Sequence, residues 1–284
     1  MKVGQGRRAA AAAVAAAGLC LALAACGSGS SSGGAAAQPA NLSADRLAAD
    51  PLTAVRGAAD ITGHSGTLQD VTLLETVSRS KRATLHGTGA YDYAARTGQL
   101  VVTVPPGAGG SAGKLTEVVT PGVVYMLGRG TKVPPGKWVK VDVRELADGN
   151  LVSSGATDPA TAAAALRGAQ TAVRAGTAVI EGETVTRYTG TLDLAQAAQA
   201  TGGAASYGLG LAARTFTTRQ VPYQVWLDEH GRIRRVVEVF TFSGVPGSTK
   251  SADQVTVTSR SDFSQFGQPV QVAVPAASEV YTGK

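Results

Sequence analysis

The chain has few of the residues that form disulfides, metal sites and aromatic clusters. Its 284 residues include two cysteines, three histidines and only 5% aromatic residues. Cys20 and Cys26 both lie near the start of the chain, so no disulfide is expected in the folded part. His64, His86 and His230 are far apart in the sequence and none stands in ligand spacing. We therefore expect neither a metal site nor a cofactor, and the fold must be stabilised by its core.

Long apolar runs and blocks of like charge are also missing beyond the first residues. After Cys26 no run of 18 apolar residues occurs, so this part of the chain is expected to be soluble. No five or six like charges follow one another, which argues against nucleic-acid binding. The densest basic cluster is Arg232, Arg234 and Arg235, which we interpret as a solvated hairpin end close to anionic lipid headgroups.

The N-terminus has the pattern of a secretory signal. Three basic residues in the first eight positions precede the uncharged run Ala9–Ala25. The run ends in LAAC, residues 23–26, which resembles the lipobox of bacterial lipoproteins. That resemblance implies cleavage before Cys26 and transfer of a diacylglyceryl group to its sulfur, which would anchor the protein on the extracytoplasmic face of the cell membrane. The alternative is an ordinary signal peptide with a chance cysteine.

A linker follows the signal. Gly27–Ala40 reads GSGSSSGGAAAQPA, a composition typical of a flexible tether. We therefore expect a signal peptide at 1–25, a lipidated tether at 26–43 and a single folded domain at 44–284. The tether matches the G-x-S-x-G nucleophile elbow at 29–33, but it lacks the strand and helix that this motif requires.

Two helices are predicted from proline-led starts. Asp50-Pro51 and Asp158-Pro159 each combine an N-cap residue with proline at the first helical position. The second helix is predicted to cover Ala160–Arg174, and glycine at position 176 ends it. A further short helix is predicted at 193–201, and 202–210 is predicted to be a loop.

Alternating apolar and polar residues predict the strands. These cover Leu68–Val77, Ala83–Tyr93, Gln99–Val104, Leu115–Thr120, Val123–Leu127, Lys137–Val143, Ala178–Leu192 with a turn at Gly182, Gln254–Asp262 and Gln268–Val274. Runs of strands with segregated helices predict an α+β fold with a curved, mostly antiparallel sheet. Because large side chains are scarce, the space beneath such a sheet is hard to fill, which suggests a cavity.

Val221–Phe242 is predicted to be a β-hairpin. A three-residue loop ends at Gly231, the one position that needs a positive φ, and pairs Asp228 with Arg232. The resulting register pairs Leu227 with Ile233, Val225 with Arg235, Tyr223 with Val237 and Val221 with Val239 on one face. On the other face it stacks the Trp226 ring on the guanidinium group of Arg234. One face is apolar except for Arg235, which we expect at a pocket rim or in solvent.

Several stretches together resemble one known family. They are the lipobox, KWVKVD at 137–142, RYTGTLDL at 187–194, VPYQVWLD at 221–228 with Gly231, and DFSQFGQPV at 262–270. Their order and combination resemble the LppX/LprAFG lipoproteins of actinobacteria, which share the fold of LolA-type carriers. The resemblance implies a half-barrel sheet wrapped over a few helices around an apolar cavity. It also implies binding and transport of lipids or lipid-linked glycans, with no catalytic residues.

The favoured hypothesis is a monomeric, membrane-anchored lipoprotein that binds and carries a lipid or another apolar molecule. Burying an acyl chain gains about 0.8 kcal/mol per CH₂ and needs no reactive group. The candidates for lining the pocket are Leu100, Val102, Met126, Val221, Tyr223, Val225, Leu227, Ile233, Val237 and Val239. Each of them could equally belong to an ordinary packed core, and Trp138 and Trp226 could be outer-face packing residues.

Two other functions stay open at this point. The first is an envelope scaffolding lipoprotein that binds a protein partner and holds no lipid. The second is an enzyme, which is disfavoured because no histidine has a recognisable triad partner in the sequence. Glu181 and Glu183 flank Gly182 as paired carboxylates, but in a turn between strands we expect them to be solvated.

Overall fold

The computed structural model describes residues 50–78, 81–106, 112–128, 130, 132–152, 158–243 and 254–283. All of the described residues belong to one compact unit, Leu42–Lys284. The predicted signal peptide, the lipobox with Cys26 and the whole tether lie outside the described residues, so they stay predictions. No helix in the described ranges is long and apolar enough to cross a membrane.

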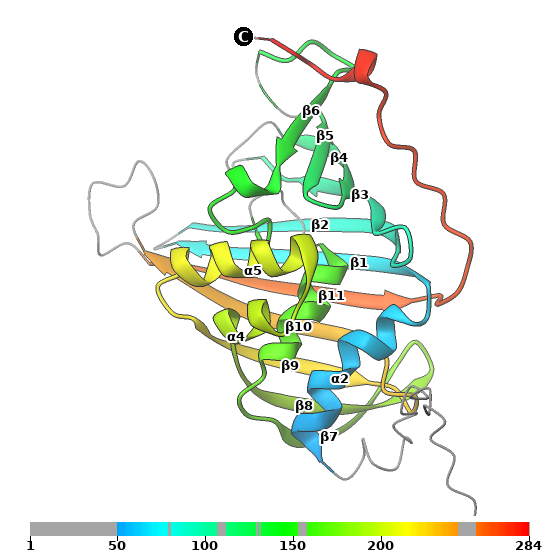
Figure 1. Ribbon diagram of the computed structural model, residues 1–284, viewed down its shortest axis with the longest axis vertical. Coiled ribbons are helices and arrows are strands. Elements are labelled where there is room, and N and C mark those ends of the chain that lie inside the picture. The colour runs from blue at the N-terminus through cyan, green and yellow to red at the C-terminus, as the bar shows by residue number, and fades with distance from the viewer. Residues whose placement is uncertain are drawn as a thin grey trace, which may run out of the picture. The chain divides into compact units, whose positions relative to one another are not determined.

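In the described part of the chain, eleven strands form one open antiparallel sheet (Figure 1). They are β1 (Thr67–Ser78), β2 (Lys81–Asp92), β3 (Thr97–Val104), β4 (Gly113–Thr120), β5 (Val123–Leu127), β6 (Trp138–Asp142), β7 (Val173–Ile180), β8 (Glu183–Asp193), β9 (Gln220–Leu227), β10 (Ile233–Ser243) and β11 (Gln254–Ser264). Their order is β6-β5-β4-β3-β2-β1-β11-β10-β9-β8-β7. The predicted α+β class with a large antiparallel sheet is confirmed.

The helices pack on one face of this sheet. They are α2 (Pro51–Gly63), α3 (Pro159–Ala165), α4 (Leu194–Gln199) and α5 (Gly203–Thr215). The described residues also form the short 3₁₀ turns η1 (Val143–Glu145), η2 (Leu166–Gly168) and η3 (Ala277–Glu279). One core cluster joins residues of all four α-helices to residues of β1, β2 and β8–β11. Figure 1 shows α2, α4 and α5 on the same side of the strands. A second apolar cluster lies on β3, β4 and β5.

Both proline-led helix starts are confirmed. The carboxylate of Asp50 accepts the backbone N–H groups of Leu52 and Thr53 at 3.1 and 3.3 Å. That of Asp158 accepts those of Ala160 and Thr161 at 3.3 and 3.2 Å. These bonds satisfy N–H groups that the first turn of a helix leaves unpaired.

The second predicted helix is too long. α3 ends at Ala165, η2 adds one turn, and the chain enters β7 at Val173 instead of continuing to Arg174. At Gly168 an added Cβ would lie 2.3 Å from the backbone oxygen of Asp193, so the chain passes another segment there in close contact. Pairing with β8 therefore overrides the helix propensity of an alanine-rich run.

The predicted loop at 202–210 is wrong, because α5 covers Gly203–Thr215. Glycines at positions 203, 208 and 210 made this stretch a poor helix candidate. The structure supplies the reason for one of them. A Cβ added to Gly208 would lie 2.8 Å from the backbone oxygen of Gly149, so α5 touches a neighbouring loop at that point.

The predicted last strand, Gln268–Val274, is also wrong. Residues 268–274 belong to no strand, although nearly all of the other strand predictions are confirmed within a few residues. β11 already pairs with β1 on one side and β10 on the other, so no edge is left next to it. The C-terminal segment instead reaches the edge strand β6, where Val280 forms an isolated bridge with Trp138.

The hairpin loop is confirmed, but the register beyond it is wrong. Gly231 has a φ of 80°, and the N–H of Asp228 donates to the oxygen of Arg232 at 3.0 Å. Leu227 pairs with Ile233 as predicted, and then a bulge shifts the register by one residue. Val225 therefore pairs with Val236, and Arg235 pairs with Trp226.

The shift exchanges the two faces of β10. Val236, Glu238 and Phe240 are buried on the face that carries the helices, whereas Val237 and Val239 are half-buried on the other face. Arg235 does not lie among the apolar side chains. Its Nη2 donates to Asp262 Oδ2 at 3.0 Å on the outer face.

Candidate ligand-binding site

The structure separates the ten predicted pocket residues into three groups. Val221, Tyr223, Val225, Leu227 and Ile233 are buried in the core cluster under the helices, Leu100, Val102 and Met126 are buried in the second cluster, and Val237 and Val239 lie on the outer face. None of them lines the two hollows described below. Their role as ligand contacts stays a prediction.

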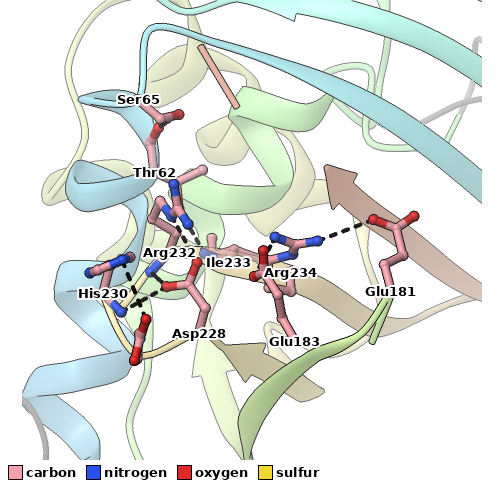
Figure 2. Close-up of polar contacts among 10 residues, drawn as sticks. Thr62, Ser65, Glu181, Glu183, Asp228, His230, Arg232, Ile233 and Arg234 are labelled. Carbon is pink, nitrogen blue, oxygen red and sulfur yellow. Dashed lines mark hydrogen bonds and ion pairs between the residues drawn. The ribbon is translucent and has the colours of Figure 1, made fainter. Parts of the chain in front are cut away.

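The bulge in β10 is attached to α2 by a polar cluster (Figure 2). The N–H of Ile233 donates to Thr62 Oγ1 at 2.9 Å. Asp228 accepts the backbone N–H of Arg232 at 2.9 Å and its Nε at 2.7 Å. The hairpin end is therefore rigidly held by side chains, and it supports the fold without forming a hollow.

Arg234 is the extra residue of the bulge, and its side chain is only 5% exposed. Its guanidinium donates to Glu183 Oε2 at 2.6 Å and to Glu181 Oε2 at 3.1 Å, as Figure 2 shows. The prediction of three solvated arginines is therefore wrong for Arg234. The stacking prediction is wrong too, because the Trp226 ring lies 5.6 Å from the guanidinium carbon of Arg235.

A cavity of about 580 Å³ lies between α2, α3, α5 and the turns that follow β2 and β4. We call it the helix–sheet cavity. Its apolar lining residues include Ala59, Tyr91, Tyr93, Val119, Ala163, Ala164, Ala204 and Ala205, and its polar ones include Asp60, His64, Arg96, Asn150, Asp158, Arg167 and Thr201. The helices present alanine where larger side chains would fill the space, so the alanine-rich sequence leaves this hollow.

The cavity wall contains buried polar groups. Burial raises the pKa of Asp158, and its hydrogen bonds with Thr161 and Ala160 oppose that rise. Burial also raises the pKa values of Tyr91 and Tyr93, so both hydroxyls stay neutral. Asn150 is 3% exposed, and its Oδ1 has no hydrogen-bond partner among the described residues. The wall thus combines apolar surface with neutral hydroxyl groups and buried polar side chains.

A second hollow, of about 850 Å³, opens beside α4. It is lined by Arg56, Arg167, Asp193, Ala195, Gln196, Gln199, Ala200 and Arg219, and we call it the arginine cleft. Arg167 and Ala200 line both the cleft and the helix–sheet cavity, so the two hollows share a wall.

Neither hollow was predicted from the sequence, because the predicted pocket residues were taken from the apolar faces of strands. The residues that line them come mainly from helices and turns. The alanine-rich stretch at 160–165 was the available signal, since five of its six residues are alanines in a core helix. In the described ranges no three or more His, Cys, Asp or Glu side chains are grouped to hold a metal ion.

Comparisons with known proteins identify similar structures. No protein-family model and no curated protein sequence matches the chain. Mycobacterium tuberculosis lipoprotein LppX has a TM-score of 0.45 at 16% identity, over 78% of this chain and 97% of LppX. LprF from Mycobacterium bovis has a TM-score of 0.43 at 15% identity, over 80% of this chain and 97% of LprF.

A third similar structure comes from Vibrio parahaemolyticus. It is a putative outer membrane lipoprotein-sorting protein domain, with a TM-score of 0.31 at 8% identity, over 81% of this chain and 95% of that domain. We carry no functional residue over from any of these proteins. The chain is thus similar in structure to the lipoprotein LppX and to LprF, whose names belong to the group that its sequence resembles.

Proposed function

We propose that this protein is a membrane-anchored lipoprotein that binds and carries a lipid or another molecule with an apolar part in the cell envelope. The observation that supports this most is the helix–sheet cavity of about 580 Å³. Small-molecule sites occupy roughly 300–1,000 Å³ and combine apolar walls with a few placed polar groups. The alanine and tyrosine walls with Asn150 and Arg167 match that description.

The physical basis of binding is the removal of apolar ligand surface from water. Each buried CH₂ of an acyl chain stabilises the complex by about 0.8 kcal/mol. The polar groups of the wall can meet the hydroxyl, ester or charged groups of an amphipathic ligand. No step of this function requires a nucleophile, a metal or a general base.

Membrane anchoring is proposed through the diacylglyceryl group on Cys26. One acyl chain binds a membrane only marginally, so the two chains of this group are needed for stable attachment. Changing Cys26→Ala in the full chain should release the protein from the membrane fraction or leave an unprocessed precursor. Full membrane retention of a cleaved Cys26→Ala protein would contradict the lipobox.

The carrier proposal is tested by organic extraction of the full chain purified from its own host, followed by mass spectrometry. We expect a co-purified lipid. Ala204→Phe places a ring in the cavity wall and should lower the lipid per protein several-fold, because the volume is lost. Ala94→Phe, at an exposed turn position outside both hollows, is the matched control and should leave the lipid content unchanged.

An empty native protein, or equal lipid in the native and Ala204→Phe proteins, would argue against carriage in this cavity. The first of these results would favour the scaffolding function instead.

A further inference from the structure

Three arginines from separate parts of the sequence meet at the arginine cleft. Arg56 belongs to α2, Arg167 to η2, and Arg219 precedes β9. Among the described residues that line the cleft, Asp193 is the one acidic residue, and its Oδ1 accepts the backbone N–H of Gln196 at 2.9 Å. The cleft therefore has an excess of positive charge, although the residues that produce it are not adjacent in the sequence.

Two of the guanidinium groups are held in place. Nε and Nη2 of Arg56 both donate to the backbone oxygen of Ala169, at 2.8 and 2.6 Å. Arg167 donates to Asp60 Oδ1 at 2.7 Å and to Thr201 Oγ1 at 3.4 Å. A group bound in the cleft would therefore meet donors that have already lost much of their rotational freedom.

Arg219 differs, because only its backbone is fixed. Its carbonyl oxygen accepts the N–H of Leu194 at 3.1 Å, at the start of α4. Within the described ranges its side chain has no hydrogen bond or ion pair, and no carboxylate lies within ion-pair distance of Arg56. Neither Arg56 nor Arg219 therefore forms an ion pair within the described part of the molecule.

The cleft adjoins the proposed ligand cavity. Arg167, with a side chain that is 23% exposed, stands in the wall that both hollows share. A molecule whose apolar part fills the helix–sheet cavity could therefore place a charged end at the arginines. Guanidinium groups bind phosphate oxygens through paired, charge-assisted hydrogen bonds.

We propose that the arginine cleft binds a phosphate group, and that this group is the charged end of a lipid whose apolar part occupies the helix–sheet cavity. The second clause rests on the proposed carrier function. A free phosphorylated molecule would offer the same chemistry to the arginines, so the two sources must be separated by experiment.

Three matched probes separate the two sources. Dihexanoylphosphatidic acid has both a phosphate and tails, dihexanoylglycerol has the same tails without phosphate, and glycerol 3-phosphate has the phosphate without tails. Each is titrated by calorimetry into the full chain in a non-ionic detergent. The variant is Arg219→Gln, and Arg219→Lys retains the charge without the planar fork. Arg214→Gln is the control, because Arg214 is exposed on α5 and lines neither hollow.

We expect the native protein to bind the phosphatidic acid more tightly than the diacylglycerol. Arg219→Gln should weaken phosphatidic acid binding about tenfold, the effect of one lost charge-assisted hydrogen bond. Arg219→Lys should recover part of that loss. The affinity for dihexanoylglycerol should not change in any variant, and Arg214→Gln should behave as the native protein with all three probes.

The outcomes distinguish this proposal from the carrier proposal. If both lipids bind and Arg219→Gln weakens neither, or weakens both equally, the phosphate site is refuted while the apolar cavity stands. If glycerol 3-phosphate binds as tightly as the phosphatidic acid and depends on Arg219, the phosphate site is supported and its link to a lipid is overturned. If no probe binds the native protein, both proposals fail.

Discussion

At the scale of single residues, the bulge in β10 determines that the side chain of Glu238 is buried. The shifted register turns its side chain to the helix-covered face, where it is 1% exposed and both carboxylate oxygens lack a partner in the described structure. Burial raises the pKa of Glu238 from its ordinary value of 4.5 to about 8. A register without the bulge would have placed this residue on the polar outer face, so the sequence pattern could not reveal its burial.

The stability of the protein should therefore fall as the pH rises. Below pH 4.5 the carboxyl is protonated in the folded and unfolded states alike, so it has no effect there. Between pH 4.5 and about 8 the unfolded chain ionises, while the folded protein must keep the proton, which favours unfolding. Glu238→Gln removes this penalty, so the stability difference between variant and native protein should grow by at least about 1.4 kcal/mol from pH 4 to pH 8.

Urea unfolding of both proteins at several pH values measures that difference. Glu145→Gln, at an exposed position, is the matched control and should show no such growth. A difference that is constant with pH would show that the folded protein does not hold Glu238 as a neutral acid.

At the scale of elements, α5 contains a matched pair of glycines with opposite expected effects. Gly208→Ala should destabilise the fold by about 1–3 kcal/mol, because its Cβ would lie 2.8 Å from the backbone oxygen of Gly149. Gly210→Ala should stabilise it by about 0.5–1 kcal/mol, because the nearest atom lies at 3.8 Å and alanine favours a helix. Chemical denaturation of the two variants tests this, and stabilisation by both would place the loop away from α5.

Some elements could be predicted from the sequence and others could not. Asp50-Pro51 and Asp158-Pro159 predicted their helices because the N-cap and the proline act within one turn. Glycine at position 208 argued against a helix locally, yet a tertiary contact requires it. The stretch at 268–274 alternates like a strand, but the strand before it, β11, is paired on both sides and offers it no free edge.

At the scale of the whole molecule, the pairing of β1 with β11 joins the two halves of the sheet. It runs from Gln69 with Ser264 to Ser78 with Val255. Each half otherwise consists of strands that pair with their neighbours in sequence. The long-range contact at the centre therefore decides whether the halves form one cooperative unit.

Two truncations of the full chain test this. Removing residues 254–284 deletes β11 and should abolish cooperative thermal unfolding, because β1 and β10 both lose a partner. Removing only 269–284 deletes the bridge to Trp138 and the hydrogen bond from Lys137 to Ser278. This truncation should lower the free energy of unfolding by less than about 3 kcal/mol. Thermal unfolding followed by circular dichroism distinguishes the two truncated proteins. Cooperative unfolding of the protein that lacks residues 254–284 would show that the two halves are joined through the helices.

The sequence by itself determined the α+β class, nearly all of the strands, two helix starts and the hairpin loop at Gly231. These features depend on alternation, caps and turns, which act over a few residues. Only the tertiary structure decided where β10 bulges, which face of β10 is buried, and which helices leave room for a ligand. It also brought Arg56, Arg167 and Arg219 to one cleft. Those features depend on contacts between segments far apart in the chain, and no local pattern encodes such distances.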